Sequence, residues 1–193
     1  MSAWVFLIPP VLVVTWGVLT YNTMVRLRQM VDESWSGIDT ELKRRYDLIP
    51  NLVDVVKGYA AHESSTFEAV VRARDRAAAS GGTPGEQARE EQALVTSVNR
   101  LLAVVEAYPD LKASAHYLQL QHELANTEDR IQAARRFFNA NVRDLNTRVA
   151  VFPSNLVAGM FGFTAAEFFE VEKSAVRAVV GVSAVGSESV MVS

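Results

Sequence analysis

The chain has 193 residues, of which 49% are hydrophobic and 9% aromatic, and these proportions exclude a wholly disordered chain. Its 19 Lys and Arg residues stand against 22 Asp and Glu residues, so it lacks the basic footprint of a nucleic-acid-binding protein. The absence of cysteine excludes disulfides, thiolate metal sites and cysteine nucleophiles. This length allows one domain of moderate size together with an anchor.

The first predicted element is a transmembrane anchor at residues 1–21. No side chain from residue 1 to residue 25 is charged, and residues 3–19 are almost wholly apolar. About 20 apolar residues cross a bilayer core of about 30 Å. Trp4 and Tyr21 stand near the two ends, where aromatic side chains favour the headgroup region. A cleaved signal peptide is the alternative, but it requires basic residues before the apolar run and a small-residue cleavage site after it, and neither is found.

Lys and Arg are distributed asymmetrically around this anchor. None precedes it, whereas Arg26, Arg28, Lys43, Arg44 and Arg45 follow it. The positive-inside rule therefore predicts that the N-terminus lies outside the membrane and that the remaining chain lies in the cytoplasm.

A heptad pattern extends from Val31 to Val70 and predicts a long helix with one narrow apolar seam. The seam positions are Val31, Trp35, Ile38, Leu42, Arg45, Ile49, Leu52, Val56, Tyr59, Glu63, Thr66 and Val70. The phase of the pattern does not change at Pro50. We therefore predict one helix over about residues 22–79 that is kinked at Pro50 without reversing.

The next helices are separated by clear breakers. Residues 80–85 (SGGTPG) form a turn, and a second helix is expected to begin near Glu86 and to end before Pro109. A third begins after Ser114, a plausible N-cap, and ends at residues 152–153 (FP). A shorter helical piece is predicted from residue 165 to about residue 177, and residues 179–193 are expected to form a disordered tail.

These elements favour an all-α architecture. Long amphipathic helices with short connections pack most naturally as an antiparallel bundle of the four-helix type, which we assign to residues 22–178. No stretch of useful length shows the alternation of a strand.

Several motifs lie along these helices: YN at residues 21–22, LKRRYDLIPNLV at 42–53, VKGYA at 56–60, VEAYPDLK at 105–112, LQLQ at 118–121 and FPSN at 152–155. Through them the chain resembles the LemA family over about residues 20–170. The resemblance implies a bacterial membrane protein with one N-terminal span and a helical-bundle domain, located in the plasma (inner) membrane. That family has no agreed biochemical activity. One branch takes part in making magnetosome membranes, which favours membrane organisation over catalysis.

The histidines do not predict a metal site. A carboxylate-bridged di-iron bundle needs paired Glu-x-x-His motifs. The residues three positions before His62, His116 and His122 are Tyr, Ala and Gln. We therefore expect ordinary surface histidines and no cofactor.

Two charges fall on the apolar seam, Arg45 and Glu63. A buried charge is costly unless it is paired, so both are expected to have partners. The third predicted helix offers a polar stripe that includes Glu128, Arg135 and Asn139. This polar seam, made of Arg45, Glu63, Glu128, Arg135 and Asn139, is either a network that specifies helix packing or a solvated edge.

Two further places are candidate partner surfaces. Lys43 and Arg44 are too far from the anchor to form a juxtamembrane lipid patch, and they either face solvent or meet an anionic partner. Residues 156–163 (LVAGMFGF), with Phe161 and Phe163, either dock back onto the bundle or bind a partner or the membrane surface.

The function that the sequence favours is a non-enzymatic scaffold or recruitment module anchored in the bilayer. Its expected partners are membrane lipid and other proteins but no nucleic acid, and a homo-oligomer is an open alternative. A rival from another class is a bundle enzyme with a metal held by carboxylates such as Glu63, Glu106, Glu123 and Glu128. A third hypothesis is a signalling receptor in which the anchor transmits movement to the bundle.

Overall fold

A computed structural model describes residues 4–170, with side chains from residue 8 onward. This part of the chain is helical and contains no strand, so the predicted all-α class is confirmed for it. The helices are α1 (Trp4–Lys57), α2 (Ser64–Ala79), α3 (Pro84–Val105), α4 (Pro109–Lys112), α5 (Ala115–Ala150) and α6 (Ser154–Phe161). The predicted tail at residues 179–193 lies outside the described residues.

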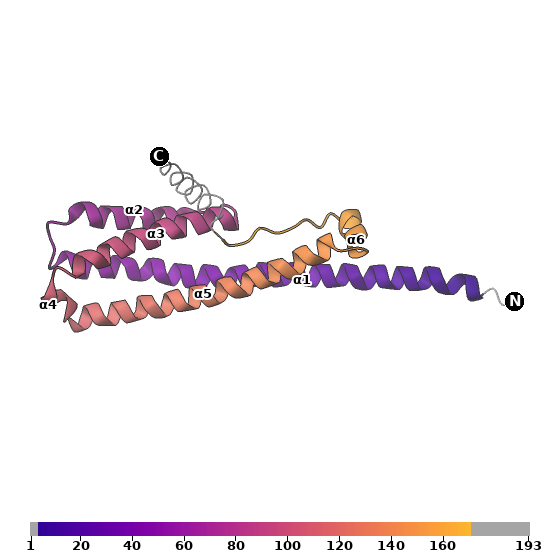
Figure 1. The fold of residues 1–193 in the computed structure, drawn as a ribbon, viewed down its shortest axis with the longest axis horizontal. Coiled ribbons are helices and arrows are strands. Elements are labelled where there is room, and N and C mark those ends of the chain that lie inside the picture. Colours follow the sequence, from indigo (N-terminus) through magenta and orange to yellow (C-terminus); the bar gives the residue numbers. More distant parts are fainter. Residues whose placement is uncertain (1–3, 171–193) are drawn as a thin grey trace, which may run out of the picture.

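Helix α1 runs along nearly the whole molecule (Figure 1). With 54 residues it is about 80 Å long at about 1.5 Å per residue. Its C-terminal half packs along α5 and α2, and α2 packs along α3. Its N-terminal half extends beyond the bundle, and α6 lies beside it where the bundle ends (Figure 1).

The core forms where the apolar seam of α1 meets α5. Ile38, Leu42 and Ile49 of α1 are almost fully buried, as are Phe138 and Val142 of α5. Trp35 adds an aromatic contact, with its ring 5.2 Å from that of Phe138. Burying a side chain of this size stabilises a fold by about 1.5–3 kcal/mol, so this seam accounts for the pairing of the two longest helices.

The prediction that α1 does not reverse at Pro50 is confirmed. Proline has no N–H to give to the carbonyl four residues earlier, which belongs to Tyr46. In the structure Arg74 of α2 donates its Nε–H to that oxygen, at 3.2 Å. The carbonyl that Pro50 leaves free is therefore satisfied by the neighbouring helix.

The prediction of one helix as far as residue 79 is wrong. Helix α1 ends at Lys57, residues 58–63 form a turn, and α2 returns antiparallel along the bundle. Val56 and Val70, which the heptad pattern places on one seam, are both fully buried but lie on different helices. The pattern identifies residues that face a core, and both helices of an αα-hairpin face the same core.

Helices α3 and α5 begin close to the predicted positions. Thr83 and Glu86 form a capping box at the start of α3, in which each side chain binds the other residue's backbone N–H, and Pro84 occupies the first turn. Ser114 stands at the N-cap of α5, although its side chain makes no capping hydrogen bond.

The region after α5 differs from the prediction. Residues 154–161, expected to be a connection, form α6, which ends at Gly162 with a left-handed φ of 71° that glycine adopts without strain. Residues 165–170, expected to begin a helix, have no regular secondary structure. The rest of that predicted helix, residues 171–177, lies outside the described residues. Residues 163–170, which we call the return segment, run back along α5 (Figure 1).

Candidate functional site

Arg45 is a buried cation that joins three helices. It projects from α1, and its side chain is only 7% exposed. Its guanidinium forms an ion pair with Glu91 of α3, and its Nη1 lies 2.7 Å from Glu128 Oε2 on α5. Helices α3 and α5 share few backbone contacts among the described residues, and Arg45 bridges them by pairing with one carboxylate of each.

Tyr46 and Gln87 extend the cluster around Glu91. The Tyr46 hydroxyl is hydrogen-bonded to the Glu91 carboxylate. Gln87 donates its side-chain amide to Glu91 Oε1 at 2.9 Å and to the Tyr46 hydroxyl at 3.1 Å. All three side chains are buried. The carboxylate of Glu91 is therefore held by one cation and two neutral donors, which is what a buried charge needs in order to be tolerated.

Burial changes the proton affinity of two members of this cluster. It lowers the pKa of the Arg45 guanidinium, although Glu128 acts in the opposite direction. It raises the pKa of the Tyr46 hydroxyl to about 12, against the favourable effect of Arg45 on the phenolate. Tyr46 thus remains a neutral hydrogen-bond donor to Glu91 near neutral pH. The hydroxyl is suited to holding the carboxylate and not to proton transfer.

Two cavities flank the Arg45 cluster on the side between α3 and α5. A small one of about 100 Å³ is bordered by Arg45, Glu91, Glu128, Arg135 and Phe169. A larger groove of about 320 Å³ continues on the other side of Arg45 and Glu128. Its lining is mainly apolar and comprises Ile49, Leu94, Val95, Val98, Leu102, Leu124 and Ala125, with Asn99 and Gln121 as further polar members. We call it the α3–α5 groove.

Asparagines on α5 hold the return segment through its backbone. Asn146 donates to the Ala166 carbonyl at 2.9 Å and accepts from the Ala166 N–H at 2.7 Å. Asn139 accepts from the Phe169 N–H at 3.0 Å. Seven helical residues and three nearly extended residues both span about 10 Å. The spacing of the two asparagines therefore matches the spacing of Ala166 and Phe169.

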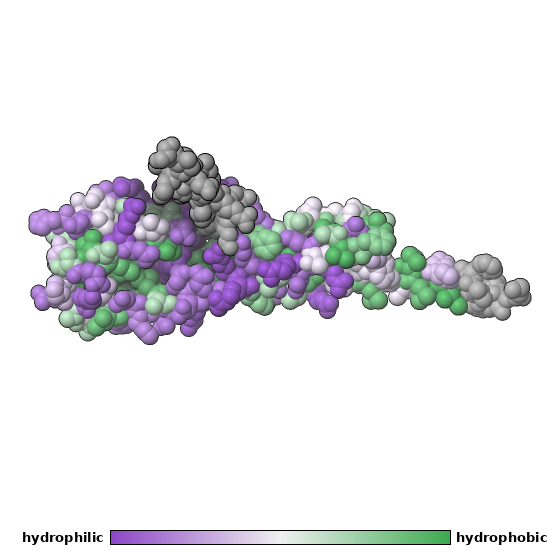
Figure 2. Space-filling view, viewed as in Figure 1, coloured by the Kyte–Doolittle hydropathy of each residue, from purple (hydrophilic) through white to green (hydrophobic). Residues whose placement is uncertain are grey.

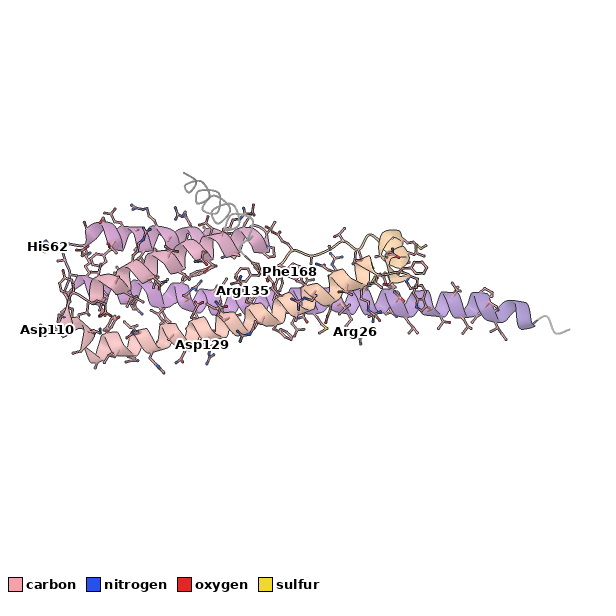
Figure 3. All side chains as sticks on the ribbon, viewed as in Figure 1. Arg26, His62, Asp110, Asp129, Arg135 and Phe168 are labelled. Carbon is pink, nitrogen blue, oxygen red and sulfur yellow. The ribbon has the colours of Figure 1, made fainter. Side chains whose placement is uncertain are left out.

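Arg135 completes this attachment. Its Nε donates to the Phe169 carbonyl at 2.8 Å, and its guanidinium lies 5.6 Å from the centre of the Phe169 ring. Figure 3 labels Arg135 beside Phe168 of the return segment. The Phe169 ring in turn meets the Trp35 ring of α1 at 5.5 Å. The polar stripe of α5 thus binds a segment of its own chain at this end.

The structure brings together only part of the predicted polar seam. Arg45 and Glu128 are paired, and Arg135 and Asn139 serve the return segment instead. The turn at residues 58–63 removes Glu63 from the seam of α1. Glu63 is instead the N-cap of α2, where its side chain makes no capping hydrogen bond. The candidate surface residues Lys43 and Arg44 are exposed, as is Phe161, while Phe163 is half-buried.

Glu91 and Gln87 are the site residues that sequence reasoning missed. They precede Leu94, Val98, Leu101 and Val105 at alternating spacings of four and three, so they continue the apolar seam of α3 toward its N-terminus. The same test that identified Arg45 as a charge on a seam would have identified Glu91. Glu91 is a closer match to Arg45 in burial than Glu128, whose side chain is 38% exposed.

The carboxylates proposed for a metal enzyme are not gathered in one place. Glu106 pairs with Lys112, Glu123 accepts from Gln119 at 3.0 Å, and Glu128 pairs with Arg45. Within residues 4–170, no group of three or more His, Asp or Glu side chains is arranged to hold a metal ion. His62 lies at the far end of the bundle in Figure 3.

Comparison with known proteins gives a consistent family match. The family model described as the LemA family matches residues 34–183. The chain is 29% identical over 177 residues to magnetosome protein MamQ 2 of Paramagnetospirillum magneticum, covering 79% of this chain and 65% of that protein. It is 27% identical over 181 residues to magnetosome protein MamQ of Magnetospirillum gryphiswaldense, covering 81% and 66%.

A relative of a different name matches a similar region. The chain is 28% identical over 140 residues to protein LemA of Metamycoplasma hominis, covering 71% of this chain and 63% of that protein. The chain therefore spans slightly less than two thirds of the length of these relatives.

Proposed function

Because the chain belongs to the LemA family, we propose that it is a single-pass membrane protein whose bundle scaffolds or recruits partner proteins at a bacterial membrane. Catalysis is not part of this proposal. Two of the relatives reported above are named as magnetosome proteins, and these names are not those of enzymes. They support a role at a membrane.

The observation that carries the proposal is the continuity of α1. Its N-terminal half contains a stretch long and apolar enough to cross a membrane, and only 6% of the most apolar 18-residue window is buried within the protein. Leu12, Val13 and Val14 are each more than 60% exposed. In water such exposure would cost about 1.5–3 kcal/mol for each large apolar side chain, whereas lipid would cover these side chains. The same helix, without interruption, is the central helix of the bundle.

We propose further that the N-terminus lies outside the plasma membrane and the bundle lies in the cytoplasm. Arg26 and Arg28 follow the apolar stretch, whereas residues 1–25 contain no Lys or Arg. The test is a pair of reporters fused after Ser193. A reporter that works only in the cytoplasm should be active, and strong activity from a periplasmic reporter would overturn the proposed topology.

The α3–α5 groove is the place on the bundle that best fits recruitment, because apolar side chains line it and α3 and α5 do not close over it. A photo-crosslinking residue at Val98, which lines the groove, should give a discrete protein adduct in intact cells. The same residue at Val71, an exposed position on α2, should not. Equal labelling from both sites, or none from Val98, would contradict recruitment through the groove.

Elemental analysis tests the rival from the enzyme class. The purified full-length protein should contain no near-stoichiometric iron, manganese or zinc. A metal that remains bound in stoichiometric amount after dialysis against chelator would favour the carboxylate-metal enzyme instead.

A further inference from the structure

Helix α6 is docked onto α1 at the point where the uncharged part of α1 ends. Val157 and Ala158 of α6 pack against Met24, which is fully buried. The Tyr21 ring lies 4.7 Å from the Phe161 ring and 5.8 Å from the Phe163 ring. Arg26, the first charged residue of α1, follows directly along this helix. One face of α6 is therefore used to hold this helix next to the end of the apolar stretch.

The opposite face of α6 is apolar and uncovered. Leu156 and Met160, one helical turn apart, are 60% and 79% exposed, and Phe152 just before the helix is 74% exposed. Val151, also before the helix, is 51% exposed. We call these residues, namely Val151, Phe152, Leu156 and Met160, the outer face of α6. Figure 2 shows hydrophobic residues gathered around α6 and the N-terminal half of α1, whereas the visible face of the bundle is more hydrophilic.

Basic residues outnumber acidic residues in the segments beside α6, where Asp32 lines a hollow together with Arg28, Phe161 and Phe163. Residues 145–163 contain Arg148 and no acidic residue, and residues 4–31 contain Arg26 and Arg28 and no acidic residue. Anionic lipid headgroups attract such a group of basic side chains by about 1 kcal/mol each. An interfacial helix usually presents its own polar face to water. Helix α6 is uncharged and instead buries its second face against α1.

The position of α6 along α1 fits the edge of a bilayer. From Trp4 to Tyr21 the helix rises about 25 Å, close to the bilayer core of about 30 Å. Tyr21 and the α6 aromatics that contact it therefore fall at the level of the headgroups when the apolar stretch spans the core. We propose that the outer face of α6 lies in the headgroup and upper acyl region of the same leaflet, as a second membrane contact beside the span. This inference rests on the proposed membrane anchoring.

The test uses spin labels on the full-length chain reconstituted in vesicles of phosphatidylethanolamine and phosphatidylglycerol. Because the chain has no cysteine, single labels can be attached to Met160→Cys on α6, Leu118→Cys on α5 and Val13→Cys in the apolar stretch. Leu118 is 48% exposed and Val13 is 66% exposed. Leu118 is the matched control because it lies at the end of the bundle farthest from α6. Collision of each label with oxygen, which is concentrated in lipid, is compared with collision with a water-soluble nickel chelate.

We expect the ratio of oxygen to nickel collisions to be several-fold higher at Met160 than at Leu118 and highest at Val13. A ratio at Met160 equal to that at Leu118, with Val13 in lipid, would overturn the inference about α6 and leave the anchor intact. A ratio at Val13 equal to that at Leu118 would overturn both the inference about α6 and the proposed membrane anchor. Spin–spin broadening at Met160 that disappears on dilution with unlabelled protein would mean that a second copy covers this face, which also overturns the lipid assignment.

Discussion

Arg74 of α2 compensates for Pro50 of α1, because its Nε lies 3.2 Å from the Tyr46 carbonyl oxygen that proline cannot bind. A proline inside a helix costs about 3 kcal/mol, of which part is the lost hydrogen bond. The helix thus passes through Pro50 with the help of a side chain from the helix that packs beside it.

This relationship predicts a specific coupling between the two positions. Arg74→Met should lower the free energy of unfolding by about 1–2 kcal/mol, since it leaves the Tyr46 carbonyl without a partner. In a Pro50→Ala background the new N–H binds that carbonyl, and Arg74→Met should then cost about 1 kcal/mol less. Urea unfolding of the detergent-solubilised chain measures the cost of Arg74→Met in both backgrounds. Arg72→Met is the control, because Arg72 is exposed and, within residues 4–170, its side chain is bonded only to Glu68. If Arg74→Met costs the same free energy of unfolding in the wild-type and Pro50→Ala backgrounds, Arg74 does not compensate for Pro50.

The second prediction concerns the ion pair of Arg45. Arg45→Leu should destabilise the bundle by about 3–5 kcal/mol, because it leaves the buried carboxylate of Glu91 without its cation. Adding Glu91→Gln should restore a substantial part of this loss, since the amide keeps the size of the side chain and carries no charge. Thermal unfolding of the full chain in detergent provides the measurement.

Glu128→Gln is the matched control for this pair. Its side chain is 38% exposed, so losing its charge should cost less than about 1 kcal/mol. An unchanged melting temperature for Arg45→Leu would show that Arg45 is not a structural residue. It would then have to be tested as a binding residue of the adjacent groove.

The third prediction concerns the return segment. Asn146→Asp keeps an acceptor for the Ala166 N–H but places a carboxylate against the Ala166 carbonyl, to which the native amide donates at 2.9 Å. We expect faster hydrogen exchange at residues 164–169 with little change in the core of α1. Thr147→Ala should leave exchange there unchanged, because the Thr147 hydroxyl donates to the Arg143 carbonyl of its own helix. Unchanged exchange in Asn146→Asp would mean that other contacts hold the segment.

The fourth prediction is a loss of stability at high pH. Burial raises the pKa of Tyr46 from 10.0 to about 12 in the folded chain, so the folded state holds this proton more tightly than the unfolded state. The resulting stabilisation is complete below pH about 10 and is lost as the pH rises toward about 12, by up to about 3 kcal/mol. Tyr46→Phe should remove this part of the pH dependence, whereas Tyr59→Phe, at an exposed position, should retain it. If the free energy of unfolding falls with pH at the same slope in wild type and in Tyr46→Phe, the loss of stability does not come from Tyr46.

The helical elements could be predicted from sequence because their signals are local. Thr83 and Pro84 mark the start of α3, and Phe152–Pro153 follows the end of α5. The turn after Lys57 was missed because its residues continue the heptad phase. In the structure Tyr59, at a seam position, is 50% exposed, whereas Ala60, beside the seam, is 1% exposed and fills the end of the core. The spacing of residue types alone therefore does not reveal a reversal whose turn residues continue the same spacing.

The site was predictable only in part, for a related reason. Arg45 and Glu128 stand out as polar residues on or beside an apolar seam, whereas the role of Asn139 and Asn146 depends on a segment that has no helical or strand pattern. Their partners are backbone groups of Ala166 and Phe169, and any residue other than proline offers the same groups. Side-chain identity at these two partner positions therefore carries no information about the contact.

The unbroken α1 has a consequence for the direction that the bundle faces within the plane of the membrane. Each helical residue turns the chain by about 100° and advances it by about 1.5 Å. One residue inserted between Leu19 and Met24 would therefore swing the α3–α5 groove by about 100° around the axis of α1. Seven inserted residues would return the groove almost to its original direction around the helix axis, about 10 Å further from the lipid. The number of residues in this short stretch thus sets the direction in which the groove faces around the axis of α1. It also sets the distance between the groove and the membrane surface.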